Sequence, residues 1–137
     1  MKRRYILDSN ALADLIYRRR GVYQRATTEQ KRGAKIGSCS PVMGELYFGV
    51  ENSSSRDENL VTLETGSRAL RIWPYRIEEA RLFGRLRAML KKMGRPMQVV
   101  DIQLAAVAFS LGNCTVVTSD SDLSAIPGLS VENWATE

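Results

Sequence analysis

The chain has 137 residues, of which 44% are hydrophobic and 26% charged, with a formal net charge of +5 and no histidine. This length suffices for one compact core, so we expect a single domain over residues 1–137. The first apolar run is cut at once by Asp8, which excludes a signal peptide and a membrane span there and indicates a soluble cytoplasmic protein.

Strands and helices alternate along the chain. In chain order, apolar runs and helix signals predict a strand at 5–7, helices at 10–20 and 22–32, a strand at 35–38, helices at 41–50 and 56–66 joined by a loop at 52–55, a strand at 70–73, helices at 77–93 and 100–111, and strands at 115–118 and 130–132. This alternation predicts an α/β fold with a mostly parallel sheet covered on both faces.

Two aspartates follow predicted strands directly. Asp8 ends the first apolar run, and Asp120 comes just after the strand at 115–118, with Asp122 two residues later. In an open α/β sheet the ligand crevice lies outside the carboxyl ends of the strands. We therefore expect these strand-end acids, although far apart in sequence, to meet in one crevice.

Two further acids lie near predicted helix starts. Asp101 opens an alanine-rich helix that we expect to be buried and to stop at Gly112. An acid is favourable at the start of a helix, because that end carries a partial positive charge. Glu45 lies one turn into a helix that we expect to begin with a serine cap at Ser40, and it flanks the apolar stripe of that helix.

Each of these acids, except Asp8, has an ordinary structural explanation when taken alone. Glu45 can be a solvated surface group, Asp101 a helix cap, and Asp120 and Asp122 turn residues. As a cluster, however, the carboxylates repel one another unless a cation neutralises them. Oxygen ligands without histidine or cysteine favour Mg²⁺ or Mn²⁺, whose chemistry is hydrolysis of phosphate esters or phosphodiesters.

Five segments carry a family resemblance, in this order: YILDSN at 5–10, SPVMGELYFG at 40–49, DIQLAA at 101–106, VVTSDSDL at 116–123 and IPGLSVENW at 126–134. In these five segments the chain resembles PIN-domain ribonucleases, in particular the VapC-type toxins of type II toxin–antitoxin pairs. The resemblance implies a three-layer α/β/α sandwich. It also implies a Mg²⁺- or Mn²⁺-dependent endoribonuclease that hydrolyses RNA and so inhibits translation or growth.

The resemblance assigns roles to residues of this chain. Catalysis and metal binding are expected of four acids, namely Asp8, Glu45, Asp101 and Asp120. The fourth position is open between Asp120 and Asp122, and we favour Asp120. Supporting roles toward water or phosphate are expected of Ser9, Asn10 and Thr118. The resemblance further implies a cognate antitoxin and a homodimer or higher toxin–antitoxin assembly.

Charge is unevenly distributed. Residues 1–35 hold ten Lys or Arg against three acids, whereas residues 99–137 hold five acids and no base. Basic side chains that can follow RNA phosphates are Arg18, Arg19, Arg20, Lys91 and Lys92, together with Arg85, Arg87 and Arg95. Each is equally well explained as part of an ordinary solvated helix face.

Two readings from other classes stay open. One is a PIN-like protein with a silent site that binds nucleic acid without cutting it. The other is a phosphatase or a receiver-like phosphoacceptor. Such a site would need a well-placed lysine, and the acidic C-terminal segment of this chain has none. The isolated Cys39 and Cys114 are interpreted as small buried side chains and not as a disulfide or metal site.

Overall fold

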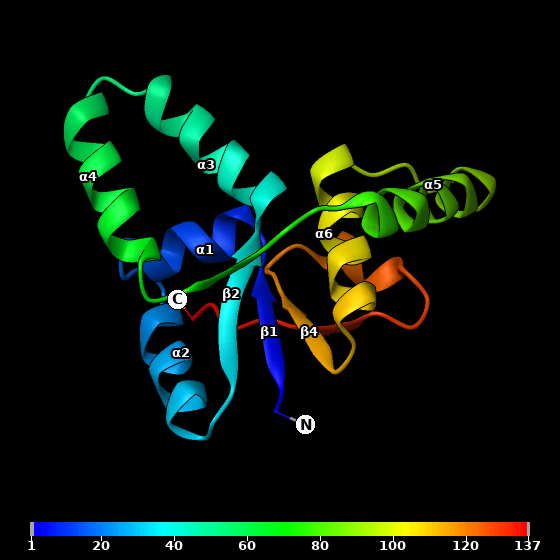
Figure 1. The fold of residues 1–137 in the computed structure, drawn as a ribbon, viewed down its shortest axis with the longest axis horizontal. Coiled ribbons are helices and arrows are strands. Elements are labelled where there is room, and N and C mark those ends of the chain that lie inside the picture. The colour runs from blue at the N-terminus through cyan, green and yellow to red at the C-terminus, as the bar shows by residue number, and fades with distance from the viewer. Residues whose placement is uncertain (1, 137) are drawn as a thin grey trace.

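Figure 1 shows the computed structural model, which describes residues 2–136. Its elements are β1 (Arg4–Leu7), α1 (Ser9–Ile16), α2 (Val22–Lys31), β2 (Lys35–Cys39), α3 (Ser40–Glu51), α4 (Arg56–Ser67), β3 (Arg71–Trp73), α5 (Ile77–Lys92), α6 (Val99–Leu111), β4 (Cys114–Val117), the 3₁₀ helix η1 (Ser121–Ala125) and β5 (Ser130–Glu132). None of the helices within this described part has the length and apolar character that a membrane span requires.

The five strands form one parallel sheet in the order β3-β2-β1-β4-β5. The helices cover both faces, so the predicted three-layer α/β/α sandwich is confirmed. The chain adds β2 and β3 on one side of β1 and then crosses to add β4 and β5 on the other. The strand order therefore reverses between β1 and β4, which is where open α/β sheets form a ligand crevice.

The core explains why the sequence forms these elements. The apolar run of β1 is fully buried at Tyr5, Ile6 and Leu7. The alanine-rich α6 is buried along most of its length, since small side chains let a helix lie close to the sheet. It ends at Gly112, whose φ of 71° is readily adopted by glycine. In β2, Gly37 has no room for a side chain, because a Cβ there would lie 1.9 Å from the carbonyl oxygen of Arg71 in β3.

Every predicted strand is present with ends within one residue of the prediction, and every predicted helix is present. Only one of these helix ends differs from its prediction by more than one residue: α1 ends at Ile16, because Arg18 and Arg20 adopt the left-handed backbone conformation, with φ of 55° and 56°. The predicted serine cap is wrong, since Cys39 occupies the N-cap position and Ser40 is the first helical residue. The short helix η1 was not predicted.

Both cysteines are free, Cys39 buried and Cys114 half-buried. Burial raises the pKa of the Cys39 thiol to about 11 and that of Cys114 to about 12. The thiolate is the form that reacts and binds metals, so these side chains act as small apolar groups, as predicted.

Candidate active site

The reversal of strand order brings two distant parts of the chain together. The Asp8 backbone N–H, just beyond β1, donates to the carbonyl of Val117 at the end of β4 at 3.1 Å. After this point the two segments diverge, one into α1 and the other toward η1. The expected meeting of the segments that carry Asp8 and Asp120 is therefore observed, at the carboxyl edge of the sheet.

Asp8 is held in a fixed orientation. It is the N-cap of α1, and its Oδ1 accepts a hydrogen bond from the backbone N–H of Ala11 at 2.9 Å. Its second oxygen accepts a short hydrogen bond from the hydroxyl of Thr118. The side chain is only 5% exposed, and this burial raises the pKa of Asp8, while the bonds from Thr118 and Ala11 oppose the rise and the charge of Asp120 adds to it.

Thr118 links the two strand ends. While its hydroxyl donates to Asp8, the same oxygen accepts the backbone N–H of Asp120 at 2.9 Å. Asp120 in turn caps η1, because its Oδ1 accepts the backbone N–H of Asp122 at 2.9 Å. Thr118 was predicted to act toward water or phosphate; in the structure its hydroxyl instead bonds to Asp8 and to the backbone N–H of Asp120 and so sets the relative position of these two residues.

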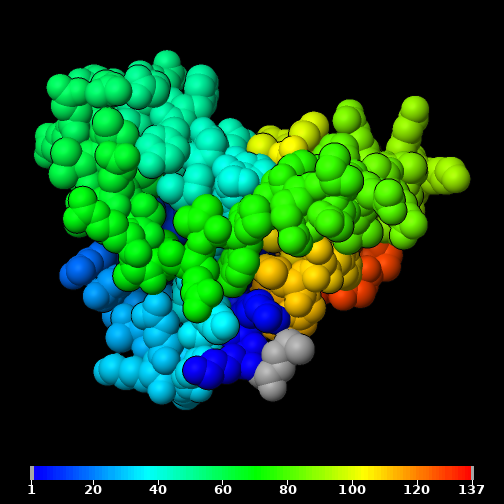
Figure 2. Space-filling model, viewed as in Figure 1, coloured from blue at the N-terminus to red at the C-terminus, as the bar shows by residue number. Residues whose placement is uncertain are grey.

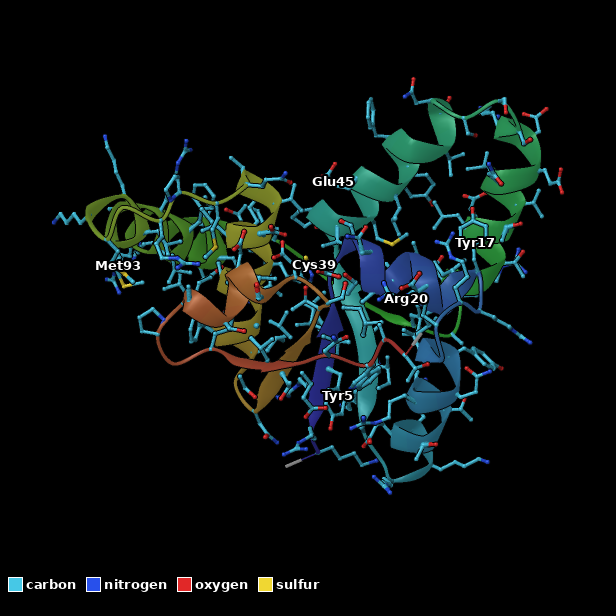
Figure 3. The ribbon with its side chains drawn as sticks, turned by 180° about the vertical axis from the view of Figure 1, so that it is seen from behind. Tyr5, Tyr17, Arg20, Cys39, Glu45 and Met93 are labelled. Carbon is cyan, nitrogen blue, oxygen red and sulfur yellow. The ribbon has the colours of Figure 1, made fainter. Side chains whose placement is uncertain are left out.

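A cavity of about 510 Å³ opens above this edge. It is lined by side chains from four regions of the chain, namely Ser9, Asn10, Glu45, Pro96, Met97, Gln98, Asp101, Asp120 and Asp122. Glu45 is exposed and lies in the first half of α3, on the side that faces the start of α6 (Figure 3). The structure thus gathers the predicted acids around one opening, with Asp8 buried beside it.

Asp101 shows the electrostatic cost of this arrangement. It lies in the first turn of α6. Burial, and then the charges of Asp8, Asp120, Glu45 and Asp122, raise the pKa of its carboxyl from 3.8 to about 6. Four of these causes are neighbouring carboxylates, so Asp101 lies among other negative charges.

Ion pairs elsewhere in the chain make the contrast clear. The buried Glu29 pairs with Arg25 at 2.9 Å, and the buried Glu79 pairs with Arg76 at 3.0 Å. By contrast, no arginine or lysine among residues 2–136 forms an ion pair with any of the four predicted acids, which are Asp8, Glu45, Asp101 and Asp120. Of the cavity acids in that range, Asp122 alone is paired, with Arg95 at 3.7 Å.

The donor set fits a hard divalent cation in its chemistry. Its members are carboxylate oxygens that carry uncompensated charge. In the described residues, however, no three acidic or cysteine side chains converge closely enough to enclose an ion by themselves. Mg²⁺ commonly takes only one or two carboxylates and fills its remaining positions with water and substrate phosphate. Such an ion would therefore need water or substrate to complete its coordination here.

The predicted basic residues fall into two places. Arg18, Arg19 and Arg20 follow the far end of α1 from Asp8, and two of them are already paired, since Arg19 and Arg20 lie 3.3 and 3.8 Å from Asp14. Lys91 instead lines a second cavity of about 490 Å³. This second cavity shares part of its lining with the acidic cavity.

Sequence reasoning missed three lining residues of the acidic cavity: Pro96, Met97 and Gln98. They lie on the connection between α5 and α6. An ordinary loop sequence gave no signal for them, because their place at the cavity depends on how these two helices pack.

Comparison with known proteins places this geometry in a family. The PIN domain model matches residues 5–129. Ribonuclease VapC2 of Haemophilus influenzae is 31% identical over 131 residues, which cover 96% of this chain and 98% of that protein. The tRNA(fMet)-specific endonuclease VapC of Salmonella typhimurium is 31% identical over 90 residues, covering 66% of this chain and 68% of that protein.

Solved structures agree with the sequence matches. VapBC2 from Rickettsia felis, bound to a DNA fragment from its promoter, superposes with a TM-score of 0.88 at 27% identity and covers 96% of this chain and 98% of that chain. VapBC-5 from Mycobacterium tuberculosis, described as a member of the VapBC family of toxin–antitoxin systems, gives a TM-score of 0.60 at 32% identity over 72% and 79% of the two chains.

Proposed function

The chain belongs to the PIN domain family, and from this premise we propose that it is a metal-dependent endoribonuclease, the toxin of a toxin–antitoxin pair. We propose further that residues 1–137 form one PIN domain that acts in the cytoplasm. Relatives named as ribonucleases and endonucleases support the reaction class. The growth effect would follow from RNA hydrolysis that inhibits translation.

One observation supports this function above all: within residues 2–136 the four predicted acids form no ion pair, and they gather at the crevice where the strand order reverses. Their mutual repulsion costs free energy in the folded state. A protein that kept this arrangement only for structure would pair its acids with arginine, as it does at Glu29 and Glu79. The unpaired charge suits a site that receives a cation together with a phosphate group.

We assign metal binding and catalysis to Asp8, Glu45, Asp101 and Asp120. A bound Mg²⁺ or Mn²⁺ supplies a more acidic water for attack and neutralises charge on the phosphate oxygens. Asp8 and Asp120, fixed through Thr118, provide oxygens in a set position. Burial and the neighbouring carboxylates raise the pKa of Asp101 to about 6 in the metal-free site, and a bound cation would offset that repulsion and favour the ionised carboxylate. Asp122 is the weaker candidate for the fourth acid, since Arg95 already balances its charge.

Ser9 and Asn10 complete the proposed site. Both line the acidic cavity at the start of α1. A hydroxyl donates one hydrogen bond and a side-chain amide two, so these groups can hold the non-attacked oxygens of an RNA phosphate. They carry no charge and therefore add no repulsion toward the substrate.

We propose a cognate antitoxin as partner, because relatives over 25% identical were solved as VapBC complexes. We also propose a homodimer, or a higher assembly with the antitoxin. The apolar surface of α3 supports an interface, since Phe48 is 66% exposed and lies among more apolar residues than one core-facing stripe requires.

The function is tested by incubating the purified chain, free of antitoxin, with a cellular RNA pool in Mg²⁺ or Mn²⁺. We expect discrete fragments that disappear with EDTA and with Asp101→Asn. The matched control is Asp57→Asn, which changes an exposed aspartate on α4 in the same way. RNA that stays intact with the folded wild-type chain, while it still binds, would support the silent nucleic-acid-binding alternative.

A further inference from the structure

The helix α5 carries two separate basic stripes. Successive residues of an α-helix are turned by about 100°, which follows from 3.6 residues per turn. Arg87 and Lys91, four residues apart, therefore share one stripe, whereas Arg81, Arg85 and Lys92 share another, roughly a third of the way around the helix. All five side chains are exposed, and none forms an ion pair within the described residues.

The two stripes differ in where they lead. The buried face of α5 carries Leu86 and Leu90, and Arg87 and Lys91 follow these positions directly in sequence. They line the second cavity, of about 490 Å³, together with Leu90, Pro96, Met97 and Ile102. The guanidinium of Arg87 lies 5.9 Å from the ring centre of Phe83, one turn earlier, so an aromatic ring helps to orient it. The other stripe is not part of this lining.

The second cavity borders the acidic one. Pro96 and Met97 line both and form a ridge between them. In Figure 2 the start of α6 is visible between α3 and α5, and Pro96 and Gln98, on the connection that leads into it, are exposed. A bound polymer that crossed this ridge would pass from Arg87 and Lys91 to the four acids.

We propose that this second cavity is a nucleotide subsite. In it Arg87 and Lys91 hold an RNA phosphate next to the one at the acidic cavity, while the base lies against the half-buried side chain of Met97. The inference rests on the proposed nuclease function and adds the place and direction in which RNA enters. Charge complementarity identifies the occupant: the acids repel a polyanion, so its binding requires cations beside them. Single-stranded RNA fits because its bases are free to lie on an apolar surface.

The subsite is tested with a fluorescein-labelled single-stranded oligoribonucleotide in EDTA, where no cleavage occurs. The Arg87→Ala/Lys91→Ala variant is compared with Arg85→Ala/Lys92→Ala, which removes the same residue types and charge from the other stripe. We expect the first variant to bind at least about tenfold more weakly than the second. The salt dependence of binding, as log K against log salt concentration, should become shallower by about 0.7 in the first variant, because the two side chains hold one phosphate and each phosphate contact on a single strand contributes about 0.7.

An equal loss in both variants would overturn the subsite, since it would mean that the net charge of α5 alone matters. Thermal unfolding should be similar for both variants, because all four side chains are exposed. Cleavage in Mn²⁺ by the wild type is measured in parallel and separates this idea from the proposed function. If the wild type cuts RNA and the two variants show equal KM, the proposed subsite is refuted and the proposed nuclease function is retained. If the wild type does not cut RNA, the nuclease function is refuted, and the binding comparison still tests the subsite.

Discussion

Replacing Asp101 by asparagine should make the metal-free protein more stable at neutral pH. The substitution keeps the shape of the side chain but removes a charge that its neighbours repel. The pKa of Asp101 is raised from 3.8 to about 6, so at pH 7 ionisation costs the folded state up to about 3 kcal/mol, at about 1.4 kcal/mol per pKa unit. Partial exposure lets water screen part of this cost.

Two corrections lower the expected gain. Asp101 lies in the first turn of α6, where a negative charge is worth about 0.3–1 kcal/mol that asparagine gives up. After screening and this loss, we expect a net gain of about 1–2 kcal/mol. The sign with pH follows from linkage: a carboxyl whose folded-state pKa is raised carries no penalty below its unfolded pKa, and the penalty grows as pH rises toward the folded pKa. The gain should therefore be nearly full at pH 7, small near pH 4 and absent below about pH 3.

Urea denaturation in EDTA at both pH values measures this effect. The control is Asp57→Asn, which also removes an acid from a first helical turn and should lose about 0.3–1 kcal/mol without any gain from relieved repulsion. Added Mg²⁺ should stabilise the wild type more than the Asp101→Asn variant, since a ligand of the folded state raises stability by mass action. A variant less stable than the wild type at pH 7 in EDTA would refute the reasoning, because it would show that Asp101 is favourably compensated in the free protein.

Three further outcomes follow from the structure. Thr118→Val should destabilise the fold by about 1–3 kcal/mol, because it leaves a buried oxygen of Asp8 without its hydrogen-bond donor. Thr118→Ser keeps the hydroxyl, so an equal loss of stability in that variant would contradict this explanation. Glu79 accepts hydrogen bonds from Arg76 and Ser110, and chiefly the Arg76 bond lowers its pKa to about 2. Its stabilisation is thus complete above pH 4.5 and lost as pH falls through about 2, so the advantage of the wild type over Glu79→Gln in acid denaturation should shrink over that range. Gly37→Ala should lower the thermal midpoint, since its Cβ would lie 1.9 Å from a backbone oxygen of β3, whereas Gly84→Ala in open space on α5 should not.

The parts of the fold that the sequence predicts are those that local pattern controls. Apolar runs locate all five strands, and the rule that ligand crevices form at the carboxyl ends of parallel strands is enough to pair Asp8 with Asp120 before any contact is known. The early end of α1 was not predictable in this way, because the left-handed Arg18 and Arg20 lie in a turn whose ion pairs reach back to Asp14.

The contacts that define the site are the least predictable. The hydrogen bond from Thr118 to Asp8 joins residues 110 positions apart. The ridge of Pro96 and Met97 depends on how α5 packs on α6. Neither leaves a local signal, because both depend on tertiary packing.

The distribution of charge connects the acidic cavity with the rest of the molecule. A nuclease must bring a polyanion to a group of carboxylates that repel it, so the attraction has to come from outside that group. The chain has a net charge of +5, yet none of its cations forms an ion pair with the four acids within residues 2–136. Beside the cavity, Arg87 and Lys91 form no ion pair within the described residues, and they lie on α5, across the ridge. On the proposed function, this separation would leave the acids free for a metal while the cations hold the RNA. Moving a cation into the acidic cavity, for instance by Gln98→Lys, should therefore weaken metal binding more than RNA binding. Mn²⁺ titration and oligoribonucleotide binding of that one variant measure both effects, and an unchanged Mn²⁺ affinity would contradict this account.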